Sequence, residues 1–179
     1  MFGADDAVPL GEADCEALGD GLLVQPVNAG SSVGYVIVGL WFAWWAFGLP
    51  KQQRPPALIY ALLLILSGAG SVIYHGRQGS VAEFLHDAPV AVLIVMAIGL
   101  PLYRRVRSRP AVPGASRVTI GVLAVCAGVA GLAYVLGRTG SPLCDPESWA
   151  QLHGMWHLAT AVGFGAWGVV LYPRTHDRA

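Results

Sequence analysis

The sequence has few charged residues for its length. Aspartate, glutamate, lysine and arginine make up 12% of its 179 residues, whereas an ordinary soluble domain carries about 25%. Eleven basic residues balance eleven acidic ones, so the formal net charge is zero. This shortage of charge argues against a disordered chain, a coiled coil and a nucleic-acid partner. The length suits a single domain or bundle.

Long apolar runs take the place of charge. A helix that crosses a bilayer needs about 20 mostly apolar residues. Lipid offers no partners for backbone polar groups, so such runs must be helical, and they lack the alternation of a membrane barrel. We therefore predict an all-α polytopic membrane protein, a bundle of about five transmembrane helices within residues 31–172. The predicted spans are 31–49, 57–75, 84–103, 118–137 and 149–172.

The charges are sorted between the two sides that five spans define. Nine of the eleven basic residues fall in the loops after the first and third spans and in the tail 173–179. Ten of the eleven acidic residues fall on the opposite side, mostly in residues 1–30. The positive-inside rule then predicts an integral protein of the cell membrane with an extracytoplasmic N-terminal segment and a cytoplasmic tail.

The three cysteines differ in their predicted surroundings. Cys15 and Cys144 both fall on the predicted outer side, where disulfides persist. We expect a bond between them, which would tie the N-terminal segment to the loop before the last span; the alternative is two unpaired thiols. Cys126 lies within the fourth span, where it is expected to be a small packing residue.

Four of the five histidines lie near the predicted outer ends of spans, where ionisable side chains are costly and indicate function. His153 and His157 are four residues apart, so both lie on one helical face and can reach one ion. His75 ends the second span at the same depth and can supply a third ligand. Three histidines plus a water form the open kind of zinc site that is typical of catalysis.

Three further polar residues lie at the same level of the membrane. Ser71 precedes His75 by about one turn, and His86 and Asp87 open the third span. Each has a structural alternative. Ser71 could donate a hydrogen bond to a carbonyl of its own helix. Asp87 could be a negative charge near a helix N-terminus that is stabilised by the helix dipole. His86 could be an interfacial side chain or the hydrogen-bond partner of a ligand.

These residues fall within short motifs that occur in order along the chain. The motifs are SVIYH at 71–75, FLHDAP at 84–89 and HGMWH at 153–157, with DCE at 14–16 and QPVN at 25–28. In these motifs the chain resembles the alkaline ceramidase family, within the wider CREST superfamily of membrane proteins. The resemblance implies a zinc ion and its water surrounded by five side chains, those of Ser71, His75, Asp87, His153 and His157.

The resemblance also implies features of the N-terminal segment. It pairs Cys15 with Cys144, in agreement with the topology. It suggests a structural calcium ion for which Asp14 and Glu16 are the candidates, although Gln25 stands where a glutamate is expected.

The chain departs from the family in its span count and in the spacing of its acidic residue. Members usually have seven spans, and we count five here. The family's aspartate lies eleven residues beyond the first histidine; here that position is His86, and Asp87 is its neighbour. We keep Asp87 as the expected base because a carboxylate can orient or deprotonate a water on a metal.

Together these observations predict an intramembrane zinc-dependent hydrolase that cleaves a lipid amide or ester in the manner of a ceramidase. Zinc would lower the pKa of its water from about 15.7 toward 7. Asp87 would accept the proton and pass it to the leaving group, and Ser71 would bind the water or the developing oxyanion. The expected partners are the lipid bilayer and a membrane lipid substrate. No oligomeric state is predicted.

Two other functions compete with this one. A non-catalytic, metal-stabilised membrane receptor, assembly factor or lipid-binding protein would use the same ligands. A haem electron carrier fits less well, since two histidines on one helical face suit a compact ion better. Zinc is inferred from the type of ligand, and histidine ligands also suit copper, nickel or iron.

Overall fold

A computed structural model describes residues 14–107 and 115–174, and within these ranges the secondary structure is helical. All five helices are long and apolar enough to cross a membrane. The all-α bundle predicted from the sequence is confirmed, and its helices have the lengths and compositions of an integral membrane protein. The expectations for residues 1–13 and 175–179 lie outside the described ranges. The helices are α1 (Pro26–Phe47), α2 (Arg54–Arg77), α3 (Ser80–Val106), α4 (Arg117–Leu136) and α5 (Leu152–Leu171).

Helix boundaries differ from the predicted spans for local reasons. α1 begins at Pro26 rather than at residue 31, and α2 also carries proline in its first turn. Proline is tolerated there because the first backbone N–H groups of a helix have no intrahelical partner. α5 begins at Leu152 rather than at residue 149. The amide of Gln151 instead donates to carbonyl oxygens of the preceding loop, among them that of Ser148 at 2.7 Å.

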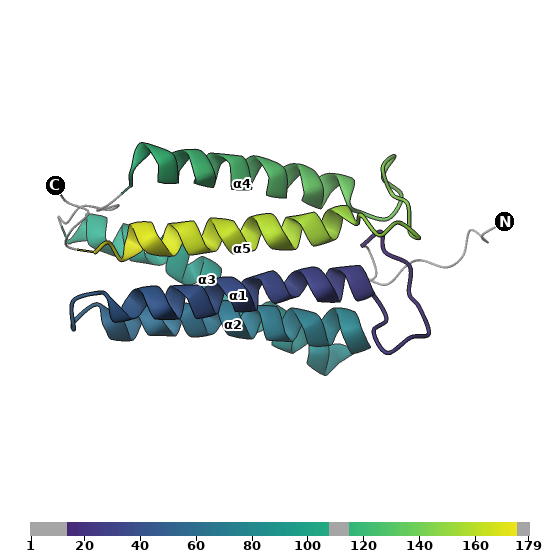
Figure 1. Cartoon of the computed structure of the whole chain (residues 1–179), viewed down its shortest axis with the longest axis horizontal. Coiled ribbons are helices and arrows are strands. Elements are labelled where there is room, and N and C mark those ends of the chain that lie inside the picture. The colour runs from purple at the N-terminus through teal and green to yellow at the C-terminus, as the bar shows by residue number, and fades with distance from the viewer. Residues whose placement is uncertain (1–13, 108–114, 175–179) are drawn as a thin grey trace.

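The helices run side by side, and the described parts of the chain begin and end at opposite ends of the bundle (Figure 1). α1 contacts α2 and α5, α2 also contacts α3, and α4 contacts α5. Around the bundle the order is therefore α3, α2, α1, α5, α4. α3 also touches α5, but no contact joins α3 to α4 among the described residues. The side of α5 between α3 and α4 is thus only partly covered, and Thr160, Phe164 and Trp167 on it are half-buried.

The apolar core lies between α1, α2 and α5. Phe42 and Tyr60 are fully buried, and their rings meet edge to face at 5.4 Å. The Tyr60 hydroxyl donates to the carbonyl oxygen of Phe164 at 2.8 Å, which satisfies a polar group deep in the bundle. Tyr60 precedes His75 by fifteen residues of α2, about 22 Å along the helix. The core therefore extends from the opposite end of the bundle up to Tyr35, whose ring lies next to that of His157.

Small residues allow α2 to approach both of its neighbours closely. A Cβ on Gly68 would lie 2.8–2.9 Å from Val36 and Tyr35 of α1. A Cβ on Gly70 would collide with the backbone carbonyl of Leu85 on α3. Close contact at small residues is a common way for helices to pack in membranes. The contact at Gly70 sets the first turns of α3 against α2 and brings the neighbouring His86 toward His75.

Candidate metal centre

The three histidines predicted to bind one ion lie together at one end of the bundle. His75 is near the end of α2, and His153 and His157 are in the first two turns of α5. Their ring centroids are 5.2 Å (His75–His153), 5.0 Å (His75–His157) and 4.5 Å (His153–His157) apart. All three are buried. Burial of three neighbouring imidazoles from two helices is the first feature that points to an ion.

Oxygen atoms of other residues lie beside the Nδ1 atoms of His75 and His153. Nδ1 of His75 is 2.7 Å from Oε1 of Gln25, a fully buried amide that precedes α1. Nδ1 of His153 is 3.1 Å from Oδ1 of Asp14. Histidine ligands usually place their second ring nitrogen in a hydrogen bond to a carboxylate or carbonyl oxygen, as His75 does, which fixes the tautomer and makes the other nitrogen a better ligand. The contact of His153 with Asp14 has the distance of an ion pair, but Nδ1 of His153 forms no hydrogen bond with the described residues.

Serine hydroxyl groups lie beside the Nδ1 atom of His157, the third histidine. Its Nδ1 atom lies 3.0 Å from Oγ of Ser31 and 3.2 Å from Oγ of Ser32. Ser32 is also 2.7 Å from Oγ of Ser71. Ser71, predicted to act on the water, is thus buried and linked to the far side of the His157 ring through Ser32.

The remaining ring nitrogens of His75 and His157 lack partners. Nε2 of each is buried and forms no hydrogen bond with the described residues. Buried polar atoms are nearly always hydrogen-bonded, so two such atoms in adjacent rings require an explanation. Coordination of a metal ion would satisfy both, because neutral imidazole nitrogen is a common ligand of zinc and other transition metals.

Two further side chains reach the same cluster. Potential ligand atoms lie within 4.8 Å of one another in the group His75, His86 and His157, and in the group Asp14, His75 and His153. The predicted set of His75, His153 and His157 is not one of these groups. Its three rings are neighbours, but their ligand atoms do not all lie within 4.8 Å of one another. His75 belongs to both groups and is the centre of the cluster.

Asp87 stands outside this cluster, next to His86. Nδ1 of His86 is 2.6 Å from Oδ1 of Asp87, whose side chain is 67% exposed, whereas that of His86 is 18% exposed. The His86 ring lies 5.9 Å from the ring of His75. The predicted base therefore contacts a histidine, and that histidine contacts the cluster.

The N-terminal segment is held against the site. Cys15 and Cys144 form the predicted disulfide, which is confirmed, with their Cα atoms 5.4 Å apart. The carboxylate of Glu16 accepts the N–H groups of Val27 and Asn28, both at 2.7 Å, in the first turn of α1. A carboxylate at a helix N-terminus accepts hydrogen bonds from backbone N–H groups that have no intrahelical partner, and its negative charge interacts favourably with the helix dipole.

Asp14 and Glu16, the candidates for calcium, have different partners. Asp14 faces His153 and lies 3.8 Å from Arg138, while both oxygens of Glu16 bind α1. Loss of water on burial raises the pKa of Asp14 to about 6; Arg138 lowers it and Glu16 raises it further. A cation on His153 would favour the ionised form of Asp14. The calcium site stays a prediction.

A pocket of about 290 Å³ opens beside the histidines. His75, His86 and His153 line it together with Trp156, whose indole stacks on His153 at 5.1 Å, and Tyr134 of α4. The pocket has polar and aromatic walls, so it can hold a polar group with an apolar attachment.

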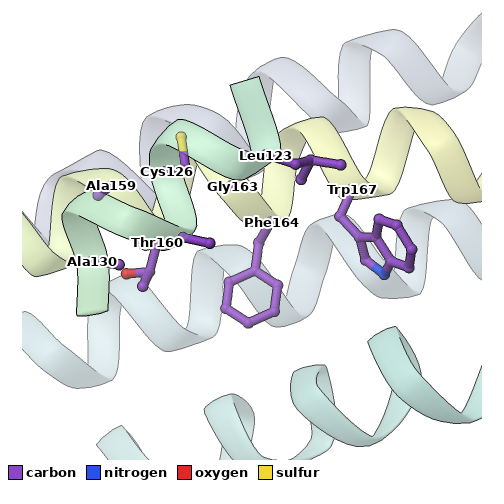
Figure 2. Close-up of a pocket in the computed structure, with 9 residues that line it drawn as sticks. Leu123, Cys126, Ala130, Ala159, Thr160, Gly163, Phe164 and Trp167 are labelled. Carbon is purple, nitrogen blue, oxygen red and sulfur yellow. The ribbon is translucent and has the colours of Figure 1, made fainter. Parts of the chain in front are cut away.

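A second, apolar pocket of about 230 Å³ lies between α4 and α5 (Figure 2). Ala130 and Thr160 line its near end, one helical turn beyond Tyr134 and Trp156 of the polar pocket. Figure 2 shows the rings of Phe164 and Trp167 projecting from α5 farther along. The two pockets thus follow one another along the same pair of helices.

Sequence reasoning missed several residues of the site. Gln25 entered only through the resemblance, and Ser31 and Ser32 were overlooked as partners of His157. The two serines open the first predicted span at the depth of the histidines, so the reasoning applied to polar groups at span ends could have found them. The roles of Gln25 and Asp14 depend on how the segment before α1 folds back, and the spacing does not reveal that.

Comparison of the chain with protein-family models, curated proteins and solved structures finds no significant match. The resemblance to alkaline ceramidases thus rests on the motifs alone.

Proposed function

We propose that this protein is an intramembrane zinc-dependent hydrolase that cleaves a lipid amide or ester, as the alkaline ceramidases do. The observation that carries the proposal is the surroundings of the ring nitrogens of the three histidines. Nδ1 of His75, His153 and His157 each lies beside an oxygen, and Nε2 of two of them is buried without a partner. The rings also border a pocket large enough for a polar head group.

His75, His153 and His157 would hold the metal, with Gln25 and Asp14 orienting two of the rings. Zinc when bound would polarise the scissile carbonyl and activate water as the nucleophile. A base in the second turn of α3, where Asp87 lies, would take the proton of that water and pass it to the leaving nitrogen or oxygen. Ser71 would act through Ser32 on the orientation of His157.

A lipid substrate is favoured by the position of the apolar pocket. An amide or ester carbonyl in the polar pocket would leave an attached hydrocarbon chain free to run along α4 and α5 past Thr160 and Phe164. The side of α5 between α3 and α4 is only partly covered, so a hydrocarbon chain could enter from the bilayer rather than from water.

The charge distribution supports a specific orientation. The end of the bundle with the histidines carries Asp14, Asp87 and the disulfide, whereas Lys51, Arg54, Arg104 and Arg117 lie at the other end. The positive-inside rule and the persistence of disulfides outside the cytoplasm both put the histidine end on the extracytoplasmic face. We propose the N-terminus outside and the C-terminus in the cytoplasm.

One observation favours the alternative of a non-catalytic, metal-stabilised membrane protein. His86 belongs to one of the two groups of potential ligands, with His75 and His157. If His86 joined the other ligands, four side chains would close the coordination sphere, as in structural zinc sites. A receptor, assembly factor or lipid-binding protein would then be the better description.

Product release by the purified protein tests the proposal. Wild type, a chelated sample, the same sample after zinc is restored, and His75→Ala are incubated in detergent micelles with N-acyl and O-acyl lipids, ceramide included. The proposal expects free fatty acid from at least one lipid, loss on chelation, recovery with zinc, and none from His75→Ala. Stoichiometric zinc without any product would favour the non-catalytic alternative.

A further inference from the structure

His86 occupies a distinct position among the histidines of the site. The rings of His75, His153 and His157 form a closed set of neighbours 4.5–5.2 Å apart. Among these rings His86 contacts only His75, at the longer distance of 5.9 Å, and its side chain is 18% exposed where the others are buried. It is therefore the outer member of the cluster, on the wall of the polar pocket.

The two nitrogens of His86 have different surroundings. Nδ1 is 2.6 Å from the carboxylate of Asp87, which can hold a proton on that atom. A potential ligand atom of His86 also lies within 4.8 Å of those of His75 and His157. With Nδ1 held by Asp87, Nε2 is the atom left to act on a group bound at the cluster.

The backbone explains why this histidine reaches the site. Gly70 lets the carbonyl of Leu85 come against α2, so the next residue, His86, stands beside α2. Pro89 lacks the N–H that would otherwise bond this same carbonyl four residues earlier. The position of His86 is thus set by a close helix contact rather than by a flexible loop.

We infer that His86, rather than Asp87, is the general base of the proposed hydrolase, and that Asp87 is a positioning residue that holds the ring of His86. This inference rests on the proposed function. Nε2 of His86 takes a proton from the attacking water as the new C–O bond forms. The same nitrogen then gives that proton to the leaving nitrogen or oxygen as the C–N or C–O bond breaks, so no other reactant is needed.

Metal content separates a base from a ligand. Zinc is measured by elemental analysis in wild type, His86→Ala, Asp87→Asn and His75→Ala, with thermal unfolding in detergent as the control for folding. We expect His86→Ala and Asp87→Asn to keep the zinc content of wild type, and His75→Ala to lose it. Loss of zinc from folded His86→Ala would make His86 a ligand and overturn the inference.

A ligand that must give up a proton tests the base without any turnover. Acetohydroxamate binds metals as an anion, so a neighbouring base that accepts its proton strengthens binding. Its affinity is read from the absorption spectrum of the cobalt-substituted protein. We expect a loss of about 10-fold or more in His86→Ala, since a hydrogen bond to a charged group disappears. Equal affinity in wild type and His86→Ala would overturn the inference.

Activity and chemical rescue test the roles of the pair. Hydrolysis should fall roughly 10²–10⁴-fold in His86→Ala and less in Asp87→Asn. Added imidazole should restore part of the activity of His86→Ala, and equally well in the His86→Ala/Asp87→Asn double variant, because free imidazole needs no positioning by Asp87. Full activity in His86→Ala would overturn the inference.

The outcomes distinguish the two proposals. If wild type binds zinc but cleaves no lipid, the proposed hydrolase fails, while the acetohydroxamate result still decides whether a base stands at His86. If wild type binds no metal, both proposals are overturned.

Discussion

Nδ1 of His75 and Oε1 of Gln25 are 2.7 Å apart, both in fully or almost fully buried side chains. The amide nitrogen of Gln25 donates to the carbonyl oxygen of Glu16 at 3.1 Å, so the amide oxygen faces His75 and can only accept a hydrogen bond. Nδ1 of His75 must then carry the hydrogen, which selects the tautomer whose Nε2 is free for a metal. We predict that Gln25→Ala weakens zinc affinity about 10–100-fold. Gln25→Glu, which keeps an acceptor, should weaken it less. Competition with a chromophoric chelator measures both, and equal losses in the two variants would contradict this role.

The hydroxyl chain from Ser71 through Ser32 to His157 predicts coupled effects. Ser71→Ala and Ser32→Ala should each lower stability or zinc affinity by about 0.5–1.5 kcal/mol. The double variant should lose less than their sum, since both remove the same 2.7 Å contact. A double-mutant cycle on zinc affinity and denaturant unfolding tests this. Strict additivity would show that Ser71 acts independently of Ser32.

The disulfide should stabilise both the fold and the site. It closes a loop of 129 residues and holds Asp14 next to His153. We predict that Cys15→Ser lowers the free energy of unfolding by about 2–4 kcal/mol and also lowers zinc affinity. Cys126→Ser, a change of the free cysteine, is the matched control. Zinc affinity unchanged by Cys15→Ser, in protein shown to be folded, would argue against a role of the bond in the site.

Trp167 is predicted to limit the length of the substrate chain. It lies seven residues beyond Thr160 on the wall of the apolar pocket, about 10 Å farther from the histidines. Its indole N–H donates to the carbonyl oxygen of Ala97 at 3.0 Å, which fixes the ring against α3. Trp167→Ala should shift the preference toward longer acyl chains, measured as kcat/KM over a chain-length series.

Trp44→Ala is the control for Trp167→Ala, because Trp44 is 66% exposed on α1 and lines neither pocket. An unchanged chain-length profile in Trp167→Ala would show that the apolar pocket does not bind the acyl chain of the substrate.

The fold was predictable because bilayer physics leaves few choices. Apolar runs of about 20 residues must be helices, and five such runs became α1 to α5. Gly68 and Gly70 are small residues of the kind that allows close helix packing in membranes, and α2 approaches its neighbours closely at both. Helix order was not predictable, since it depends on which faces meet, and neither hydropathy nor loop length specifies that.

The site was predictable in part. The spacing of His153 and His157 and the depth of His75 brought the three rings together, because a helix fixes which residues share a face. The neighbours of those rings were harder to foresee. Gln25 and Asp14 come from an irregular segment, and the choice between His86 and Asp87 depends on the direction of one turn of α3. Such details follow from tertiary contacts, which motif spacing does not encode.

Zinc stoichiometry tests the central claim most directly. Elemental analysis of purified wild type, His75→Ala and His157→Ala should give one zinc per chain in wild type and a clear loss in both variants. His176, the fifth histidine, belongs to the predicted cytoplasmic tail, so His176→Ala should retain the wild-type content. Equal zinc in wild type, His75→Ala and His157→Ala would contradict the metal centre and the hydrolase built on it.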